Sequence, residues 1–324
     1  MKKGFIAGII LLATASAVPM ITQEPYILQT LSIAYVFAIY SIGWNILALS
    51  GQVSLGHAAF FGIGAYSSVI LARAYGLPPA ITVVVGPLFT ALVGLGIGLL
   101  CVRLKEWFLA MVTFGFAVIM QAIVVDDQLR WLTNGWDGLL APHLIPPEFE
   151  PRRVWNYYAL LAATVITYIA SYLIFNSRLG LAFKTIRDNE LVARVCGVKT
   201  MRYKLLSFVI STYIAGVAGA LQYHVLFRFL SPEVFHLQTS FWPLIFTVGG
   251  GLGTLEGPLI GSIILWLAWE AFRAIAGFYG LIGLGIFLAL VIILMPGGIR
   301  SLIAKAPSLI YGFGERRKVI SQGM

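Results

Sequence analysis

The sequence has few charged residues, and this shortage excludes a soluble globular fold. Only 11% of its 324 residues are Asp, Glu, Lys or Arg, whereas about a quarter of an average soluble protein is charged. Hydrophobic residues make up 59% of the chain, and too little polar sequence remains to cover a helical core of that size. Long uncharged runs and a mean hydropathy of +0.90 instead indicate an all-α, polytopic membrane protein.

Residues that carry enzyme chemistry are also scarce. Two cysteines, Cys101 and Cys196, and four scattered histidines form no disulfide framework and no metal-ligand spacing. No Gly-Lys dipeptide occurs in the chain, so the P-loop motif of ATPases is absent. The net charge of +9 is attributed to membrane orientation rather than to nucleic-acid binding. The sequence therefore predicts a protein that is not an enzyme and that binds no metal or cofactor itself.

Apolar segments of about 20 residues, the length that crosses a bilayer, recur along the chain. We expect about ten spans, near residues 4–21, 26–49, 57–72, 80–102, 107–125, 154–175, 205–227, 234–255, 259–272 and 278–295. The first span follows Lys2 and Lys3 and contains the small-residue run at 13–17, so it also resembles a signal peptide. Its apolar character continues to Ile21, which favours an uncleaved span.

Lysine and arginine residues are distributed unevenly between alternate loops. With the N-terminus inside, 16 of the 22 fall on inner segments and 6 on outer segments. Because basic loops stay in the cytoplasm, both termini are predicted to be cytoplasmic. This orientation places the loop at 176–204 and the tail at 297–324 inside, and the Pro-rich loop at 126–153 in the periplasm. The whole chain, 1–324, is interpreted as one membrane domain.

The inner loop at 176–204 is polar and basic, and its apolar residues recur at helical spacing. Two apolar stripes result: Phe183 with Ile186, and Leu191 with Val195 and Val198. Asp188 or Asn189 is suited to cap a second helix, and Gly197 is suited to end it. We expect two short amphipathic helices with a bend between them. They either rest on anionic membrane lipid or insert a stripe into a groove on a cytoplasmic partner.

Two glycine-rich segments, at 50–57 and 249–258, interrupt the apolar spans in the two halves of the chain. Broken spans in corresponding positions are typical of substrate paths and moving elements in transporters. Close helix packing by small residues is the alternative, above all for Gly62 and Gly64. The candidate path residues are Gly51, Gln52, Ser54, Gly56, His57, Gly250, Gly251, Gly253 and Thr254. For the histidine, a hydrogen-bonded structural role is favoured.

One carboxylate, Glu270, interrupts an otherwise apolar span. An acidic residue inside a membrane is a functional candidate by default. Arg273 follows three residues later and shares its helix face. This spacing favours a local ion pair over a role in transport.

Three segments together resemble a known family. Residues 51–66 (GQVSLGHAAFFGIGAY), 177–221 (beginning SRLGLAFKTIRDNELVARVCGVK) and 250–261 (GGLGTLEGPLIG) are similar to the LivM-type permease of bacterial branched-chain amino-acid ABC importers. The outer segment NGWDG at 134–138 resembles a TGGSDGL-like stretch of that family, with a tryptophan as a departure. The resemblance extends over about residues 26–300.

The resemblance implies a multi-pass permease subunit of the bacterial inner membrane that imports branched-chain amino acids by ATP-driven alternating access. It implies a LivH-like second permease, two cytoplasmic ATPase subunits that use the ATP, and a periplasmic substrate-binding protein. The inner loop would couple to the ATPases through Lys184, Arg187, Asp188, Asn189, Glu190, Ala193 and Gly197. Related permeases for urea, amides or aromatic acids are alternatives. A secondary transporter is a weaker one, because carboxylates within the spans are nearly absent.

Overall fold

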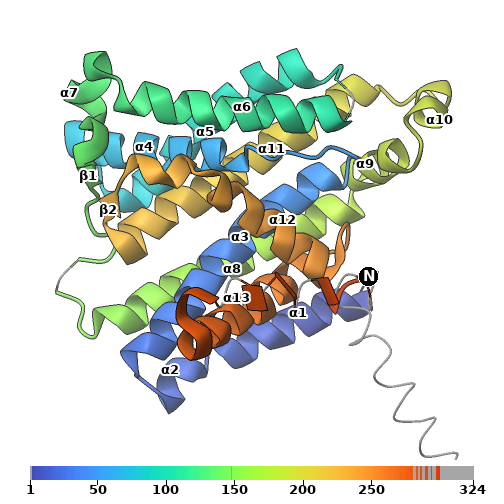
Figure 1. Cartoon of the computed structure of the whole chain (residues 1–324). Helices are drawn as coiled ribbons and strands as arrows, with labels where there is room; N and C mark the ends of the chain where they lie inside the picture. Colours follow the sequence, from blue (N-terminus) through green and yellow to red (C-terminus); the bar gives the residue numbers. More distant parts are fainter. Residues whose placement is uncertain are drawn as a thin grey trace, which may run out of the picture.

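The computed structural model describes residues 2–104, 106–146 and 148–279, and beyond them residues 282, 283, 285, 286, 289, 290, 293 and 297–299. Its first half contains α1 (Lys2–Ala15), α2 (Val18–Ile21), α3 (Pro25–Ala48), α4 (His57–Ala74), α5 (Pro79–Cys101), α6 (Glu106–Val125), η1 (Asp127–Leu129), α7 (Arg130–Thr133), η2 (Gly135–Asp137) and β1 (Leu139–Leu140). Its second half contains α8 (Arg152–Asn176), α9 (Arg178–Asp188), α10 (Glu190–Val195), α11 (Thr200–Leu221), η3 (Gln222–Phe227), β2 (Phe229–Leu230), η4 (Pro232–Phe235), α12 (Leu237–Gly251), α13 (Gly257–Ala276) and η5 (Gly277–Tyr279). Figure 1 shows these elements as one bundle of helices.

Six helices in the described part of the chain are long and apolar enough to cross a membrane. They correspond to the spans expected at 26–49, 80–102, 107–125, 154–175, 205–227 and 259–272, so an all-α, polytopic membrane fold is confirmed. The expected spans at 4–21, 57–72 and 234–255 coincide with shorter elements: α1 with α2, α4, and η4 with α12. Most of the tenth expected span, 278–295, lies outside the described residues. The count of ten therefore stays a prediction.

Helix α3 forms the centre of the bundle, where it packs against α8, α11, α12 and α13. Nearly all of its second half is buried, polar residues included. Glycines bring its neighbours close. A Cβ atom on Gly43 would lie 2.9 Å from the side chain of Ile214 on α11, and one on Gly64 of α4 would overlap the backbone of Gly216. Close packing by small residues, the alternative considered for Gly62 and Gly64, is therefore what the structure shows at the second of these positions.

The crossing of α4 and α11 gives a sharp stability prediction. Gly64→Val would force the two backbones apart, and overpacking of this kind costs about 1–3 kcal/mol or more. Gly96→Val on α5 adds the same atoms where no atom lies within 4 Å of the new carbon. We expect the melting temperature of the purified protein in detergent to fall for Gly64→Val and to stay near that of the wild type for Gly96→Val. Equal losses would contradict the close crossing.

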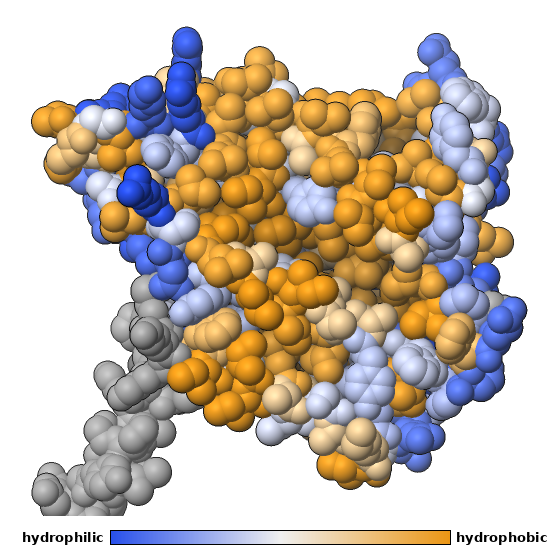
Figure 2. Space-filling model, turned by 180° about the vertical axis from the view of Figure 1, so that it is seen from behind, coloured by the Kyte–Doolittle hydropathy of each residue, from blue (hydrophilic) through white to orange (hydrophobic). Residues whose placement is uncertain are grey.

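The bundle has two hydrophilic ends, separated by an apolar middle. In Figure 1, α7, β1 and β2 lie at one end, whereas α9, α10 and the start of α1 lie at the other. Figure 2 shows a broad hydrophobic band across the molecule with hydrophilic side chains at both ends. This distribution matches a protein that exposes its middle to hydrocarbon and its ends to water.

The loop at 126–153 forms the end opposite α9 and α10. Before α8 begins at Arg152, the described residues of this loop contain only the short helices η1, α7 and η2 and the two-residue strand β1. Its prolines disfavour a longer helix. A small antiparallel ladder was not predicted: Leu139 pairs with Leu230 and Leu140 with Phe229, across 91 and 89 residues respectively. Local sequence carries no signal for a two-residue strand whose partner is so distant.

Candidate functional site

The inner loop folds as the two helices that its sequence predicts. Ser177 caps α9, and the side-chain oxygen of Asn189 accepts hydrogen bonds from the backbone N–H groups of Leu191 and Val192 at 3.0 and 3.1 Å. Asn189 also marks the bend, because its extended backbone separates the two helices. Gly197 follows with a φ of +82°, the left-handed conformation expected of a residue that ends a helix.

One side of the loop is buried and the other carries apolar side chains exposed to solvent. Phe183, Ile186 and Ala193 face the bundle and are at most 3% exposed. Leu191 and Val195 lie on the opposite face of α10, where they are 72% and 89% exposed. Leaving two large apolar side chains this exposed is unfavourable in water. This exposed pair suits either occupant considered for the loop, membrane lipid or a cytoplasmic partner.

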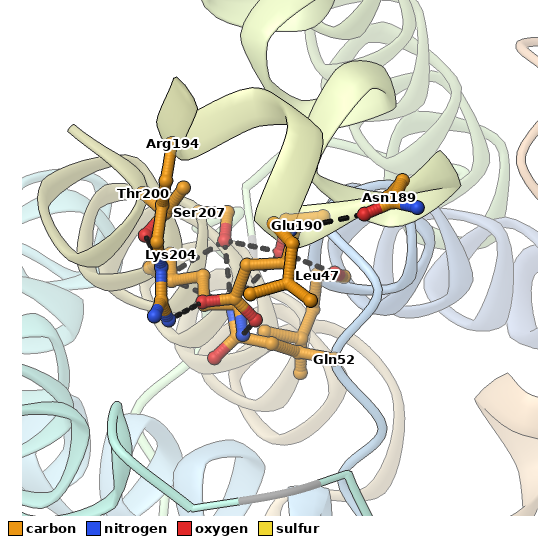
Figure 3. A network of polar contacts seen from close by, with 10 residues as sticks. Leu47, Gln52, Asn189, Glu190, Arg194, Thr200, Lys204 and Ser207 are labelled. Atoms are coloured by element: carbon orange, nitrogen blue, oxygen red, sulfur yellow. Dashed lines mark hydrogen bonds and ion pairs between the residues drawn. The ribbon is translucent and has the colours of Figure 1, made fainter. Parts of the chain in front are cut away.

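A polar network joins α10 to the bundle (Figure 3). The carboxylate of Glu190 forms ion pairs with Arg194 and with Lys204 on α11. Gln52, from the first glycine-rich segment, donates hydrogen bonds to the carbonyl oxygen of Lys204 at 2.9 Å and to the hydroxyl of Ser207 at 3.0 Å. The loop, α11 and the segment after α3 are therefore connected by charge-assisted and neutral hydrogen bonds.

The ionisation of Glu190 determines the strength of this network. Burial disfavours the charged carboxylate, but hydrogen bonds and charges from Lys204 and Arg194 outweigh burial and hold the pKa of Glu190 below its usual range. A depressed pKa means that the stabilisation is present above the unfolded-state pKa and is lost as pH falls through the folded-state pKa. The two ion pairs of Glu190 are thus formed at neutral pH and are lost only in acid, whereas the hydrogen bonds of Gln52 do not depend on pH.

We expect Glu190→Gln to lower stability by about 1–2 kcal/mol at neutral pH, because Lys204 is only 12% exposed and would lose its counter-charge. The difference from the wild type should shrink as the pH falls below the usual pKa of a Glu side chain, about 4.3, and should vanish once the pH lies below the depressed folded-state pKa of Glu190, where the native carboxyl is also neutral. Thermal unfolding in detergent at several pH values measures it. Glu24→Gln, at an exposed carboxylate without an ion pair among the described residues, is the control and should show no such difference.

Arg187, near the end of α9, lies against both glycine-rich segments. A Cβ atom on Gly51 would lie 3.2 Å from the Cα atom of Arg187, and one on Gly253 would overlap the Nη1 atom of its guanidinium. Both glycines also have positive φ values, +76° and +69°. Asp188 pairs with Arg187 at 3.1 Å. The loop and the two interruptions, which the sequence analysis treated as separate candidates, therefore form one contiguous site.

The second interruption is a tight turn between α12 and α13. Asn45 on α3 accepts a hydrogen bond from the N–H of Gly253 at 2.9 Å and donates one to the carbonyl of Thr254 at 2.8 Å. The helices meet without side chains between them, since a Cβ atom on Gly250 would overlap the carbonyl of Gly257, and one on Gly261 would overlap that of Phe246. The turn is held by α3 rather than left open.

The part of the first interruption that follows Gln52 is also fixed by hydrogen bonds and close packing. The carbonyl of Ser54 accepts a hydrogen bond from the indole of Trp44 at 3.0 Å. Gly56 fits against the backbone of Thr113 on α6, leaving no space for a side chain. His57 is fully buried, and its Nε2 atom shares a hydrogen bond of 3.0 Å with Ser211. This hydrogen bond agrees with the structural role favoured for the histidine, although its buried Nδ1 atom has no hydrogen-bond partner among the described residues. No described contact assigns these residues to a substrate path, and that role stays a prediction.

The described residues offer no metal centre, because no group of three or more His, Cys, Asp or Glu side chains among them is placed to hold an ion. Neighbouring side chains satisfy the carboxylate of Glu270. Arg273 forms an ion pair with it at 2.7 Å, as predicted, and Tyr26 donates a hydrogen bond at 3.0 Å. What remains is a loop with an exposed apolar stripe, fixed to two helix interruptions in a membrane bundle.

Comparison with known proteins decides the family. Residues 26–295 match the family described as the permease component of branched-chain amino acid transport systems. The chain belongs to this family. It is 28% identical to the permease protein LivM of Escherichia coli K12 and 27% identical to that of Salmonella typhimurium, in each case over 92% of this chain and 75% of the relative. The permease protein LivH of Escherichia coli K12 is 24% identical, over 86% of this chain and 97% of LivH. No solved structure matches the chain significantly.

Family membership and the six long apolar helices identify the chain as a multi-pass permease of the bacterial inner membrane. Within this permease, the predicted coupling residues do not all lie on the exposed face. Lys184 extends back over the ring of Phe175, 5.3 Å from its centroid, and Ala193 is fully buried. Arg187 contacts both glycine-rich segments, yet its side chain is still 37% exposed. Asp188 and Gly197 are exposed.

Sequence reasoning missed two residues that organise this permease. Asn45 is the only Asn within the 24 residues of α3, and a lone amide in an apolar span is a usable signal. His224 is fully buried near the opposite end, where its two ring nitrogens lie 2.9 Å from the hydroxyl of Ser68 and 2.8 Å from the carbonyl of Pro142. His224 therefore connects the Pro-rich loop to α4 through hydrogen bonds. No local sequence pattern predicts this role.

Proposed function

We propose that this chain is the membrane permease subunit of an ABC importer that moves branched-chain amino acids from the periplasm to the cytoplasm by ATP-driven alternating access. The family and the printed substrate of its LivM and LivH relatives support the substrate class. One observation carries the mechanism: the α9–α10 loop contacts both helix interruptions through Arg187 while its own apolar stripe stays uncovered. A partner that moves this loop moves both interruptions.

The proposed orientation has both termini in the cytoplasm, and the proposed count is about ten spans. The excess of Lys and Arg on the inner segments supports this orientation. The start of α1 lies at the same end as α9 and α10, which agrees with it (Figure 1). Residues 126–153 are then periplasmic and 176–204 cytoplasmic. The proposed cytoplasmic tail, 297–324, lies almost wholly outside the described residues.

Three kinds of partner complete the proposed importer. Similarity to LivH over most of both chains supports a second, LivH-like permease of related architecture. Two cytoplasmic ATPase subunits would bind the α10 stripe and use the ATP, since this sequence has no P-loop motif and would bind no cofactor itself. A periplasmic binding protein would deliver the substrate to the end formed by α7, β1 and β2.

The two glycine-rich interruptions are proposed to act as the moving part of the path rather than as a fixed binding pocket. Gly51 and Gly253 contact Arg187, and Gln52 bonds to α11. Gly250, Gly251, Thr254, Ser54, Gly56 and His57 lie in the same two segments. Discontinuous helices that shift together are typical of alternating access.

The decisive test is uptake into proteoliposomes. The chain co-reconstituted with a LivH-like permease, both ATPases and the binding protein should accumulate labelled leucine only when ATP is present. Urea, acetamide and phenylalanine, offered in parallel with binding proteins for each, test the substrate class separately from the mechanism. Leucine uptake by this chain alone, driven by an ion gradient, would overturn the ABC assignment in favour of a secondary transporter.

A further inference from the structure

A basic cleft lies beside the inner loop and is lined by neither Leu191 nor Val195, the exposed apolar pair described above, although Glu190 and Gly197 of the loop reach its wall. It has a volume of about 1160 Å³ and lies between the turn that follows α5 and the turn that joins α10 to α11. Arg103 and Trp107 line one side, and Lys199 and Arg202 line the other. The cleft is therefore built from two turns, far apart in sequence, that meet at the α9–α10 end of the bundle.

The charge inside the cleft is strongly unbalanced. Its lining contains five cationic side chains and a single carboxylate, Glu190, which is already paired with Arg194 and Lys204. The other three cations, Arg103, Lys199 and Arg202, are exposed and have no ion-pair partner among the described residues. Like charges gathered in one cleft repel one another, and an anion that contacts all three relieves the repulsion.

The wall of the cleft continues into surface that faces hydrocarbon. Trp107 is 82% exposed, and Met111, one helical turn further along α6, is 69% exposed. Leu100, at the end of α5, is 77% exposed. Tryptophan is enriched at the boundary between membrane and water, with apolar residues beyond it. The ligand that fits this site has an anionic group for the cleft and an apolar part for the helix surface below it.

We propose that the cleft binds the phosphate headgroup of an anionic phospholipid, with its acyl chains along Trp107 and Met111 of α6. Basic pockets between membrane helices at the cytoplasmic face are suited to such headgroups. A soluble anion would satisfy the cations but not the apolar wall. The bound lipid would bridge the α5–α6 turn and the α10–α11 turn, and would therefore connect the coupling loop to α6, an element that the Glu190 network does not include.

The test uses the purified permease complex, stripped of lipid and given phosphatidylglycerol or phosphatidylcholine with the same acyl chains. Native mass spectrometry measures how much of each lipid is retained. Each cation near an anionic headgroup strengthens binding about fivefold, so Arg103→Gln with Arg202→Gln should weaken phosphatidylglycerol binding about 25-fold. The control is Arg73→Gln with Arg153→Gln, which removes the same charge outside the cleft. It should retain the lipid as the wild type does.

The proposal requires selective retention of phosphatidylglycerol by the wild type, and its loss from the cleft variant alone. Equal retention of both lipids, or equal loss from both double variants, would overturn it. Displacement of the phospholipid by inorganic phosphate would assign the cleft to a soluble anion instead. Loss of the ATPase subunits from the cleft variant with lipid retained would assign the cleft to the protein interface. The last two outcomes reject the lipid site and leave the proposed transport function intact.

Discussion

Leu191→Asp combined with Val195→Asp should reduce ATP-dependent uptake about 100-fold and release the ATPase subunits from the purified complex. Burying each of these apolar side chains contributes about 1.5 kcal/mol to binding, and together they account for about two orders of magnitude in affinity. Both side chains are mostly exposed in the permease, at 72% and 89%. The permease fold should therefore remain intact, with a melting temperature close to that of the wild type.

Two further variants test whether the loss is specific to the exposed apolar side chains of α10, Leu191 and Val195. Leu191→Ala with Val195→Ala keeps an apolar surface of reduced area, so it should give an intermediate loss of ATPase binding. Leu140→Asp adds a charge at an apolar position that is 63% exposed on the opposite end of the bundle, and should leave the ATPase subunits bound. Full retention of both ATPase subunits by the Asp double variant would show that α10 does not dock them.

Asn45→Leu should destabilise the α12–α13 turn and lower uptake about tenfold. The substitution keeps the branching of the side chain at Cγ but leaves the N–H of Gly253 and the carbonyl of Thr254 without partners. An unsatisfied polar group in a partly buried site costs about 1–3 kcal/mol. The melting temperature and leucine uptake of the reconstituted importer measure the two effects separately.

The matched control for Asn45 is Asn176→Leu. Asn176 is exposed and donates one hydrogen bond, to Tyr172 within its own helix, so its loss should change the melting temperature little. Asn45→Gln provides a second comparison, because it keeps the amide but places it one carbon too far from the turn. If Asn45→Leu were as stable and as active as Asn176→Leu, the turn would not depend on α3.

Local sequence patterns predicted the inner loop in detail. Asn189 and Gly197 act through their own neighbours: one caps the N–H groups two and three residues later, and the other adopts the left-handed backbone that ends a helix. The Glu270–Arg273 pair was predictable for the same reason, since residues three apart share a helix face. Each of these features depends on fewer than five residues of chain.

Long-range contacts were beyond the reach of those patterns. The contact of Arg187 with Gly51 and Gly253 joins residues more than 60 positions apart, and the glycines were predicted only as interruptions without a known neighbour. For the same reason, local patterns did not predict that Lys204 pairs with Glu190 or that the carbonyl of Pro142 pairs with His224. Burial and hydrogen bonding between distant elements depend on the assembled bundle, and periodicity within one segment does not record them.

Because the backbones of α12 and α13 are in contact, we expect the two helices to move together as one rigid unit. With Gly250 and Gly261 at the crossing, no side chains separate the helices, and neither can roll against the other. The 20 residues of α13 span about 30 Å. A tilt of about 5° at the turn that Asn45 holds would therefore displace the far end of α13, at Ala276, by about 2.6 Å, and would displace Glu270, about 20 Å from the turn, by about 1.7 Å. A small movement at the cytoplasmic loop would thus displace residues on the opposite side of the membrane.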